Sequence, residues 1–256
     1  MREHPVVFVS VVRDFDLYAR CVKDNPFCAA AEKVAFDNRE RNESIPVLYN
    51  RFLASRPADE EAWYVFCHED WQLKEELLPR LRDLDRNALY GPIGVITKVR
   101  FGLYCQWYLV GAIEGCRRDG TDVRAIGHRD DSLPVVDTFD CQCLIVHSSC
   151  LRRAKLGFDE HLTYDLYLED LCIAARERCG IFSRVLQLDC RHWSASTAQA
   201  RYYVQKAYLD AKYPLVSYTG TSSWSIGGSP SLRMRLNMLA KKAYWRVKGL
   251  VGGLSP

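Results

Sequence analysis

The sequence predicts an α/β fold in which a mostly parallel central sheet is flanked by helices. The run "VVFVSVV" at residues 6–12 is β-branched and almost uninterrupted, which is typical of a strand covered on both faces. Further apolar runs alternate with helical patterns along the chain, as in parallel α/β domains. Several of these runs end in polar clusters, the arrangement found at the ligand-binding edge of such sheets.

The composition is that of a soluble globular protein with enough chain for a large core. Of the 256 residues, 48% are hydrophobic and 26% are charged. No apolar run reaches transmembrane length, and the first one is too short for a signal peptide and is soon followed by Asp14 and Asp16. The eleven cysteines are scattered without paired CxxC spacing. We therefore expect reduced, mostly buried thiols in a cytosolic protein, and no structural zinc site.

The first half of the chain supplies three strands and three helical segments in alternation. Residues 6–12 form the first strand, followed by a loop and a short helix that stops near Pro26. A short strand then ends at Asp37-Asn38. Ser44 is a good N-cap for the next helix, with Pro46 in its first turn. The third strand, "AWYVFCHED", is followed by the helical pattern "WQLKEELLPRLRDL", which Pro79 interrupts.

The second half is less regular until its last third. Strand character returns in "LYGPIGVIT" and in "PVVDTFDCQCLIVHSS", and a glycine-rich region of unclear pattern separates the two. The clearest helix is "LYLEDLCIAARERCG", whose apolar residues share one face and whose Gly180 fits the C′ position. A final strand, "IFSRVLQLDCRHWS", ends at Arg191-His192.

The segment His68-Glu69-Asp70 ends the third strand and has two interpretations. If the backbone is extended there, His68 and Asp70 project to one face and Glu69 to the other. An incomplete set of ligands of this kind suits Mg²⁺ or Mn²⁺ shared with a phosphate. Alternatively, Asp70 only caps a helix that begins at Trp71.

A second acidic pair, Glu169 and Asp170, lies near the start of the clearest helix. The positive end of the helix dipole favours an ionised carboxylate there, which could accept a proton from a hydroxyl nucleophile. The plainer interpretation is that both are solvated acids at a helix start.

The C-terminal residues 230–256 differ from the rest in charge. From residue 231 onward the chain has six basic residues and no acidic one, whereas the remainder has 29 basic and 32 acidic residues. Leucines share one helical face with basic residues beside it, and Tyr244 and Trp245 suit a headgroup boundary. The pattern is typical of an amphipathic helix on an anionic membrane. A helix packed on its own domain or on a partner is the alternative, and a nucleic-acid interface is weaker because the body has no basic excess.

In order and spacing, these segments from about Val6 to about Lys212 resemble bacterial glycosyltransferases of the GT-A fold, near glycosyltransferase family 2 and its StrF-like members. The resemblance rests on five segments, in which His-x-Asp replaces the usual Asp-x-Asp: "SVVRD", "FDNRERNESIPVLYNRFL", "YVFCHEDWQL", "GFDEHLTYDLYLEDLCIAARERCG" and "CRHWSASTAQARYYVQKAYLDAKYP". It also departs from the family at Cys141, where a glycine commonly follows an aspartate.

The resemblance implies an enzyme that transfers a sugar from a nucleotide-diphosphate or CMP sugar to a hydroxyl of a surface polysaccharide or glycolipid, with inversion. Asp170 would be the catalytic base and Glu169 the second choice. The implied donor contacts are Ser10, Asp37, Asn38, His68 and Asp70, and the implied metal ligands for Mg²⁺ or Mn²⁺ are Asp70, His68 and His192. Residues 1–229 would form the transferase domain, and residues 230–256 would hold it at the inner face of the cell membrane.

Two other function classes stay open from the sequence. A glycosyltransferase-like domain without catalysis could serve as a binding or scaffold protein in a polysaccharide-assembly complex, which the missing first aspartate of the metal motif favours. A hydrolase or nucleotidyltransferase on a similar sheet is weaker. Nucleotidyltransferases would be expected to have a Gly-rich basic loop after the first strand, and "SVVRDFDLYARC" has no glycine.

Overall fold

The computed structural model describes residues 4–100, 104–193, 200–222 and 225–228, together with the single positions 236, 239 and 243. The predicted tail helix, residues 230–256, lies outside the described residues apart from those three positions. Among the described residues, no helix is both long enough and apolar enough to cross a membrane.

A mixed seven-stranded sheet forms the centre of the fold, in the order β2-β1-β3-β11-β5-β12-β9. Its strands are β1 (Val6–Val12), β2 (Glu32–Asp37), β3 (Trp63–Cys67), β5 (Leu89–Gly91), β9 (Val135–Val136), β11 (Cys143–His147) and β12 (Ser183–Val185). β1 is parallel to β2 and β3, and β12 is parallel to β5. β11 and β9 are antiparallel to their neighbours. The α/β class is confirmed, and parallel pairing is concentrated in the β2-β1-β3 half.

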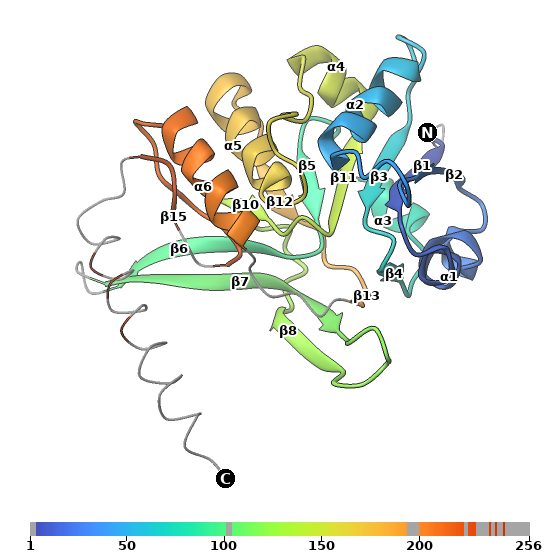
Figure 1. Ribbon diagram of the computed structural model, residues 1–256, viewed down its shortest axis with the longest axis horizontal. Helices are drawn as coiled ribbons and strands as arrows, with labels where there is room; N and C mark the ends of the chain where they lie inside the picture. The colour runs from blue at the N-terminus through green and yellow to red at the C-terminus, as the bar shows by residue number, and fades with distance from the viewer. Residues whose placement is uncertain are drawn as a thin grey trace.

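Both faces of this sheet are covered, as the apolar run of β1 predicts. Val7 and Val9 pack with the side chains of α2 (Ile45–Ser55), α4 (Ser148–Ala154) and α5 (Tyr167–Cys179). Val6 and Phe8 point the other way, toward α1 (Phe15–Tyr18), the helical turns at Ala19–Lys23 and Pro26–Cys28, and α3 (Leu78–Leu81). Figure 1 shows α2, α4 and α5 together on one side of the sheet. Alternate residues of one strand thus fill two separate cores.

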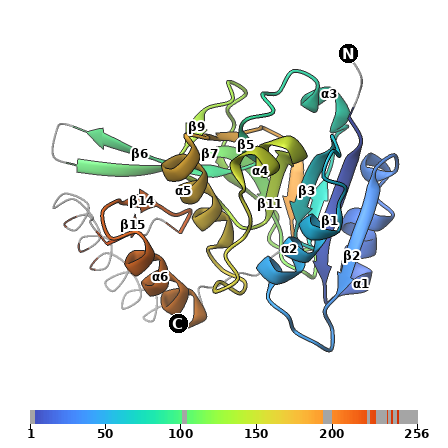
Figure 2. The same ribbon diagram turned by 90° about the horizontal axis from the view of Figure 1, so that it is seen from above.

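A second sheet of six strands adjoins the first and includes a long hairpin. Its order is β10-β6-β7-β13-β4, with β8 paired to β7. The strands are β4 (Trp71–Leu73), β6 (Gly94–Arg100), β7 (Tyr104–Gly115), β8 (Arg124–His128), β10 (Thr138–Phe139) and β13 (Cys190–His192). Viewed from above, β6 and β7 project beyond the main sheet, while α6 (Ala200–Lys212) lies near β14 (Tyr218–Thr219) and β15 (Ser225–Ile226) (Figure 2).

Local sequence signals account for the two longest central helices. Ser44 caps α2 by accepting from the Val47 amide, with Pro46 in the first turn. At the end of α5, Gly180 has a positive φ of 64°, and its amide and that of Ile181 bond back to Arg176 and Ala175. Both helix ends were predicted at these residues, and glycine fits the second because it adopts left-handed backbone without a Cβ clash.

The prediction of a helix that starts at Trp71 is wrong. Trp71–Leu73 forms strand β4, paired antiparallel with β13 so that Trp71 lies opposite His192. Only Leu78–Leu81 of that segment is helical. Trp71 is fully buried, and its pairing with a distant strand outweighs the local helical pattern. The helix-cap interpretation of Asp70 is therefore excluded.

Candidate functional site

His68, Asp70 and His192 meet where β3 ends and β4 begins. The Trp71 amide donates to the His68 carbonyl, which closes a tight turn that presents both side chains of the His-x-Asp pair. The Trp193 amide donates to the Asp70 carbonyl, and this bond fixes the end of β13 beside the turn. Strand pairing thus brings His192 to two residues that lie more than a hundred positions earlier in the chain.

The three side chains present ligand atoms to a common point. His192 Nε2 is 3.2 Å from Asp70 Oδ1, and His68 Nδ1 is 3.9 Å from the same oxygen. One ligand atom from each residue lies within 4.8 Å of the others. Asp70 Oδ1 and His192 Nε2 are buried, and neither makes a contact with hydrogen-bond geometry. Buried polar atoms left in this state are expected to have a further ligand, so the donor set fits a divalent cation.

A hydrogen-bonded chain sets the tautomer of His68. The Tyr167 hydroxyl donates to the Cys141 carbonyl at 2.6 Å and lies 2.9 Å from His68 Nε2. Its single proton is used on the carbonyl, so His68 Nε2 carries a proton and donates to Tyr167. His68 Nδ1 is then the unprotonated nitrogen facing Asp70. Metal-binding histidines are oriented in this way by their second nitrogen.

Burial and charge act in opposite directions on these groups. Burial lowers the pKa of His68, which keeps its imidazole neutral. Burial also disfavours the charged forms of His192 and Asp70, but their mutual attraction is stronger. The pKa of His192 is raised and that of Asp70 is lowered as a result. Asp70 is therefore an ionised carboxylate, and a cation bound there would take the place of protonated His192 as its partner.

Glu69 lies in the turn after β3 and has different partners from His68 and Asp70; the extended backbone predicted for these residues is wrong. Glu69 Oε2 accepts from the backbone amides of Arg13 and Asp14, which follow β1. Burial raises the pKa of Glu69. Glu69 thus ties the loop after β1 to the end of β3 and helps to shape the space in front of Asp70.

A cavity of about 260 Å³ opens next to His68 and Asp70. Three arginines line it: Arg13, Arg118 and Arg201. The Arg118 guanidinium lies 3.8 Å from Glu69 and 3.9 Å from Asp14, and its side chain is 58% exposed. Arg201 stacks on Tyr164 at 4.7 Å and bonds to Asp165. Two carboxylates besides Glu43, one imidazole and three guanidinium groups around one cavity suit a phosphorylated ligand that is shared with a cation.

The other predicted donor contacts occupy different surroundings. Ser10 is fully buried, and its Oγ lies 3.3 Å from Cys67 Sγ. Asp37 is exposed and paired with Arg39. Asn38 lines the cavity, but its amide is used in two bonds with the backbone of Glu43. Asn38 is therefore placed to shape the cavity wall, while Ser10 and Asp37 lie away from the cavity lining.

The acidic pair at the start of α5 is buried rather than solvated. Burial raises the pKa of Glu169 to about 8, and its Oε2 accepts from the Cys141 thiol at 3.1 Å. Asp170 accepts from Lys212 and from the Tyr213 hydroxyl, both at 2.7 Å. Neither residue lines the 260 Å³ cavity. Glu169 is connected to His68 through Cys141 and Tyr167, whereas Asp170 connects α5 to α6.

Sequence reasoning missed the cavity arginines and the orienting Tyr167. Arg118 lies beyond β7, in the glycine-rich region whose pattern is unclear, and only the adjacent pair Arg117-Arg118 marks it there. Tyr167 belongs to the strongest helical segment, where an aromatic residue is expected to be core. Its ring is indeed fully buried, and only its hydroxyl reaches the site.

Comparison with known proteins supports the architecture. No protein-family model matches the sequence, and no curated protein sequence matches it. Among solved structures, the chain is similar to "Crystal structure of GalNAc-T7 with UDP, GalNAc and Mn2+", with a TM-score of 0.50 at 9% sequence identity. The similarity covers 81% of this chain and 48% of that one, so this chain spans about half the length of its structural neighbour. The order and pairing of its elements give this chain a GT-A-like α/β fold.

Proposed function

We propose that this chain is a nucleotide-sugar-dependent glycosyltransferase. The observation that carries the proposal is the convergence of His68, Asp70 and His192 at the carboxyl edge of β3, beside an arginine-lined cavity in a GT-A-like fold. The structural neighbour was solved with UDP, GalNAc and Mn2+. A nucleoside diphosphate sugar is therefore the first donor class to test, and a hydroxyl of a glycan or lipid-linked glycan is the proposed acceptor.

The chain's own residues can bind and orient such a donor. His68, Asp70 and His192 would hold Mg²⁺ or Mn²⁺, which when bound neutralises charge on the leaving diphosphate. Arg118 and Arg201 add positive charge along the cavity. Glu69 and Asn38 hold the adjoining backbone through the contacts described above, so the cavity keeps its shape before the donor arrives.

The catalytic base would remove the proton of the acceptor hydroxyl. The sequence resemblance implies Asp170 for this role, whereas the contacts in the structure favour Glu169. Burial raises the pKa of Asp170, but its Oδ1 already accepts from an ammonium and a phenol, which leaves it engaged rather than facing an acceptor. Burial raises the pKa of Glu169 to about 8, so its ionised form would be a stronger base than an ordinary carboxylate, and it is connected to the site through Cys141. We propose Glu169 as the base and inverting transfer as the outcome. The anomeric configuration of the product, read by NMR, tests the second part.

The test is a donor screen on the full-length protein with a matched variant. Uridine, guanosine and cytidine sugar nucleotides are added with and without Mn²⁺, and the unfolding temperature and release of free sugar are measured. We expect one nucleotide class to stabilise the protein only when Mn²⁺ is present. Asp70→Asn should remove this effect, and the exposed Asp59→Asn should keep it. Stabilisation without any sugar release or transfer would support the scaffold alternative, and no stabilisation by any donor would refute the proposal.

We also propose that residues 230–256 hold the enzyme at an anionic membrane surface. The support is the charge and apolar pattern of the tail, together with the exposure of Leu236 and Leu239. A chain ending at Ser229 should lose binding to vesicles that contain anionic lipid, whereas equal binding of both chains would contradict the proposal.

A further inference from the structure

Three more potential ligands lie at the opposite edge of the same sheet: His4, Glu61 and His147. His4 and Glu61 come just before β1 and β3, and His147 ends β11, which is antiparallel to β3. His147 is opposite Trp63 in the register, so all three residues are at the edge where β3 begins. Glu61 and His68 are seven residues apart, or about 23 Å along an extended strand. The cluster is therefore separate from the candidate active site.

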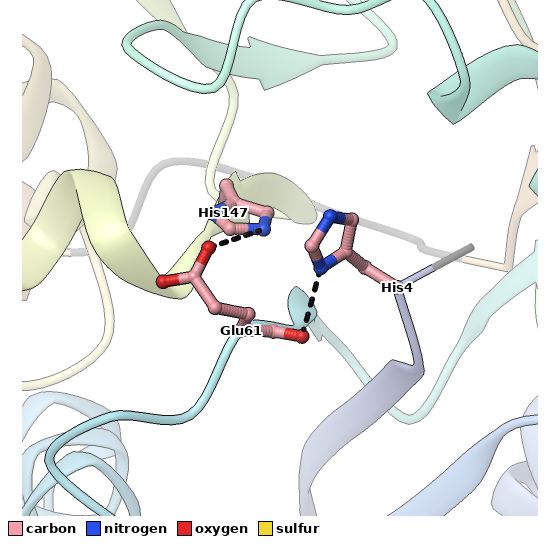
Figure 3. A group of neighbouring side chains, drawn as sticks. All are labelled: His4, Glu61 and His147. Carbon is pink, nitrogen blue, oxygen red and sulfur yellow. Dashed lines mark hydrogen bonds and ion pairs between the residues drawn. The ribbon is translucent and has the colours of Figure 1, made fainter. Parts of the chain in front are cut away.

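The three side chains face one another (Figure 3). His147 Nε2 lies 3.8 Å from Glu61 Oε2, and the two imidazole rings are perpendicular with centroids 4.9 Å apart. One ligand atom from each residue lies within 4.8 Å of the others. Metal–ligand bonds of about 2.0–2.2 Å place ligand atoms about 3.4 Å apart in a tetrahedral site. The side chains would have to move together by only about 1 Å to reach that spacing.

Each imidazole has one nitrogen engaged with a neighbouring group, and its other nitrogen faces the cluster. His4 Nδ1 lies 3.1 Å from the Glu61 carbonyl, which can only accept, so Nδ1 carries the proton and Nε2 is free to bind a cation. His147 Nδ1 accepts from the Ser149 amide at 3.4 Å and lies 2.8 Å from the Ser149 hydroxyl, so Nε2 carries the proton in the empty site and would release it to bind a cation. Anchoring the second nitrogen on an oxygen is the usual arrangement of metal-binding histidines.

His147 Nε2 is the strongest indication that a ligand is missing. His147 is 0% exposed, and its Nε2 makes no hydrogen bond although it faces the Glu61 carboxylate. A fully buried nitrogen without a partner is costly, and a cation bound there would remove that cost.

We propose that His4, Glu61 and His147 bind a divalent transition-metal ion of the zinc class. Two imidazoles and one carboxylate suit Zn²⁺ and its neighbours better than Mg²⁺ or Ca²⁺, which prefer oxygen ligands. Glu61 is exposed and His4 is half-buried, so an ion can enter from solvent. Cysteine spacing gives no signal for a site of this composition. The ion would join the starts of β1 and β3 to the end of β11.

Two arginines near Glu61 limit the affinity of this site. Arg152 bonds to Oε1 at 2.7 Å, and Arg86 lies 3.8 Å from Oε2. Arg152 leaves Oε2 free for the ion, but both positive charges oppose a cation. Arg86→Ala should therefore tighten Zn²⁺ binding several-fold, because its guanidinium lies by the oxygen that the ion would use.

The test measures metal binding directly on the full-length, tag-free protein. The double variant His68→Ala/Asp70→Asn is used as the background, so that the active-site cluster keeps a single imidazole and contributes little. Zn²⁺ is titrated against a chromophoric chelator, and we expect one equivalent to bind. Adding His4→Ala should weaken this binding at least tenfold and abolish the rise in unfolding temperature that Zn²⁺ causes. His161→Ala, an exposed histidine outside both clusters, should change neither.

Two further measurements make the result decisive. Co²⁺ in place of Zn²⁺ should give the strong visible absorption of a four-coordinate site, and His4→Ala should remove it. Should His4→Ala unfold, Glu61→Gln serves as the second ligand variant. Equal Zn²⁺ affinity with and without His4 or Glu61, or a six-coordinate Co²⁺ spectrum, would overturn the proposal. Because the readout is binding and not transfer, the result is independent of the proposed enzyme function.

Discussion

Replacement of the buried Glu169 by glutamine should make the stability of this protein less sensitive to pH. Burial raises the pKa of Glu169 from the ordinary 4.5 to about 8. Between these two values the folded protein keeps a proton that the unfolded chain has released. The stability contributed by the protonated form is thus fully present below pH 4.5 and is lost as the pH rises toward 8.

The size of the effect follows from the shift. One pKa unit corresponds to about 1.4 kcal/mol, so Glu169 alone should lower the wild-type free energy of unfolding by about 1.4 kcal/mol per pH unit over this range. The whole shift gives about 5 kcal/mol as an upper bound, because local relaxation reduces the penalty. Glutamine resembles the protonated acid and can still accept from the Cys141 thiol, but it cannot ionise.

The assay is urea unfolding followed by circular dichroism at several pH values between 5 and 8.5. The difference between Glu169→Gln and wild type should grow with pH in favour of the variant, and the exposed Glu40→Gln should run parallel to wild type. Other titrating groups, such as Glu69, are present in all three proteins and cancel in the difference. A constant difference between Glu169→Gln and wild type across the range would refute the assignment of a raised pKa to this carboxyl group.

Three further predictions concern Gly111 in β7, the contacts that Asp170 of α5 makes with Lys212 and Tyr213, and the arginines of the cavity. Gly111 has a φ of 85°, and a Cβ there would lie 2.2 Å from the Pro92 carbonyl oxygen, whereas Gly120 has the same φ with nothing nearer than 3.8 Å. In urea unfolding, Gly111→Ala should therefore cost more than the ~1–2 kcal/mol of backbone strain expected for Gly120→Ala, and equal costs would contradict the clash. Asp170→Asn should lower the free energy of unfolding by about 1–3 kcal/mol, because Lys212 and Tyr213 lose a buried charged acceptor; an unchanged unfolding midpoint would rule out that anchoring role. Arg118→Ala should weaken binding of a nucleoside diphosphate in calorimetry, most clearly at low salt, while Arg117→Ala, whose guanidinium pairs with Asp122, should not; equal losses would indicate a general charge effect.

Local sequence patterns predict an element correctly where its conformation depends on residues that are close in the chain. The β-branched run of β1 had to be covered on both faces, and the caps Ser44 and Gly180 act on neighbouring backbone groups. Such signals depend on residues within a few positions of one another. The segment after Asp70 failed for the same reason, because Trp71 takes its conformation from β13 and not from its neighbours.

The candidate site likewise has some features that follow from the local sequence and others that depend on tertiary contacts. The sequence by itself determined that His68, Glu69 and Asp70 stand together at the end of a buried strand, since they directly follow its apolar run. Only the tertiary structure decided that His192 completes the cluster and that Tyr167 sets the tautomer of His68. It also placed Asp170 against Lys212 and Glu169 against Cys141. These contacts join residues far apart in the chain, and strand pairing and helix packing bring them together where no local pattern records them.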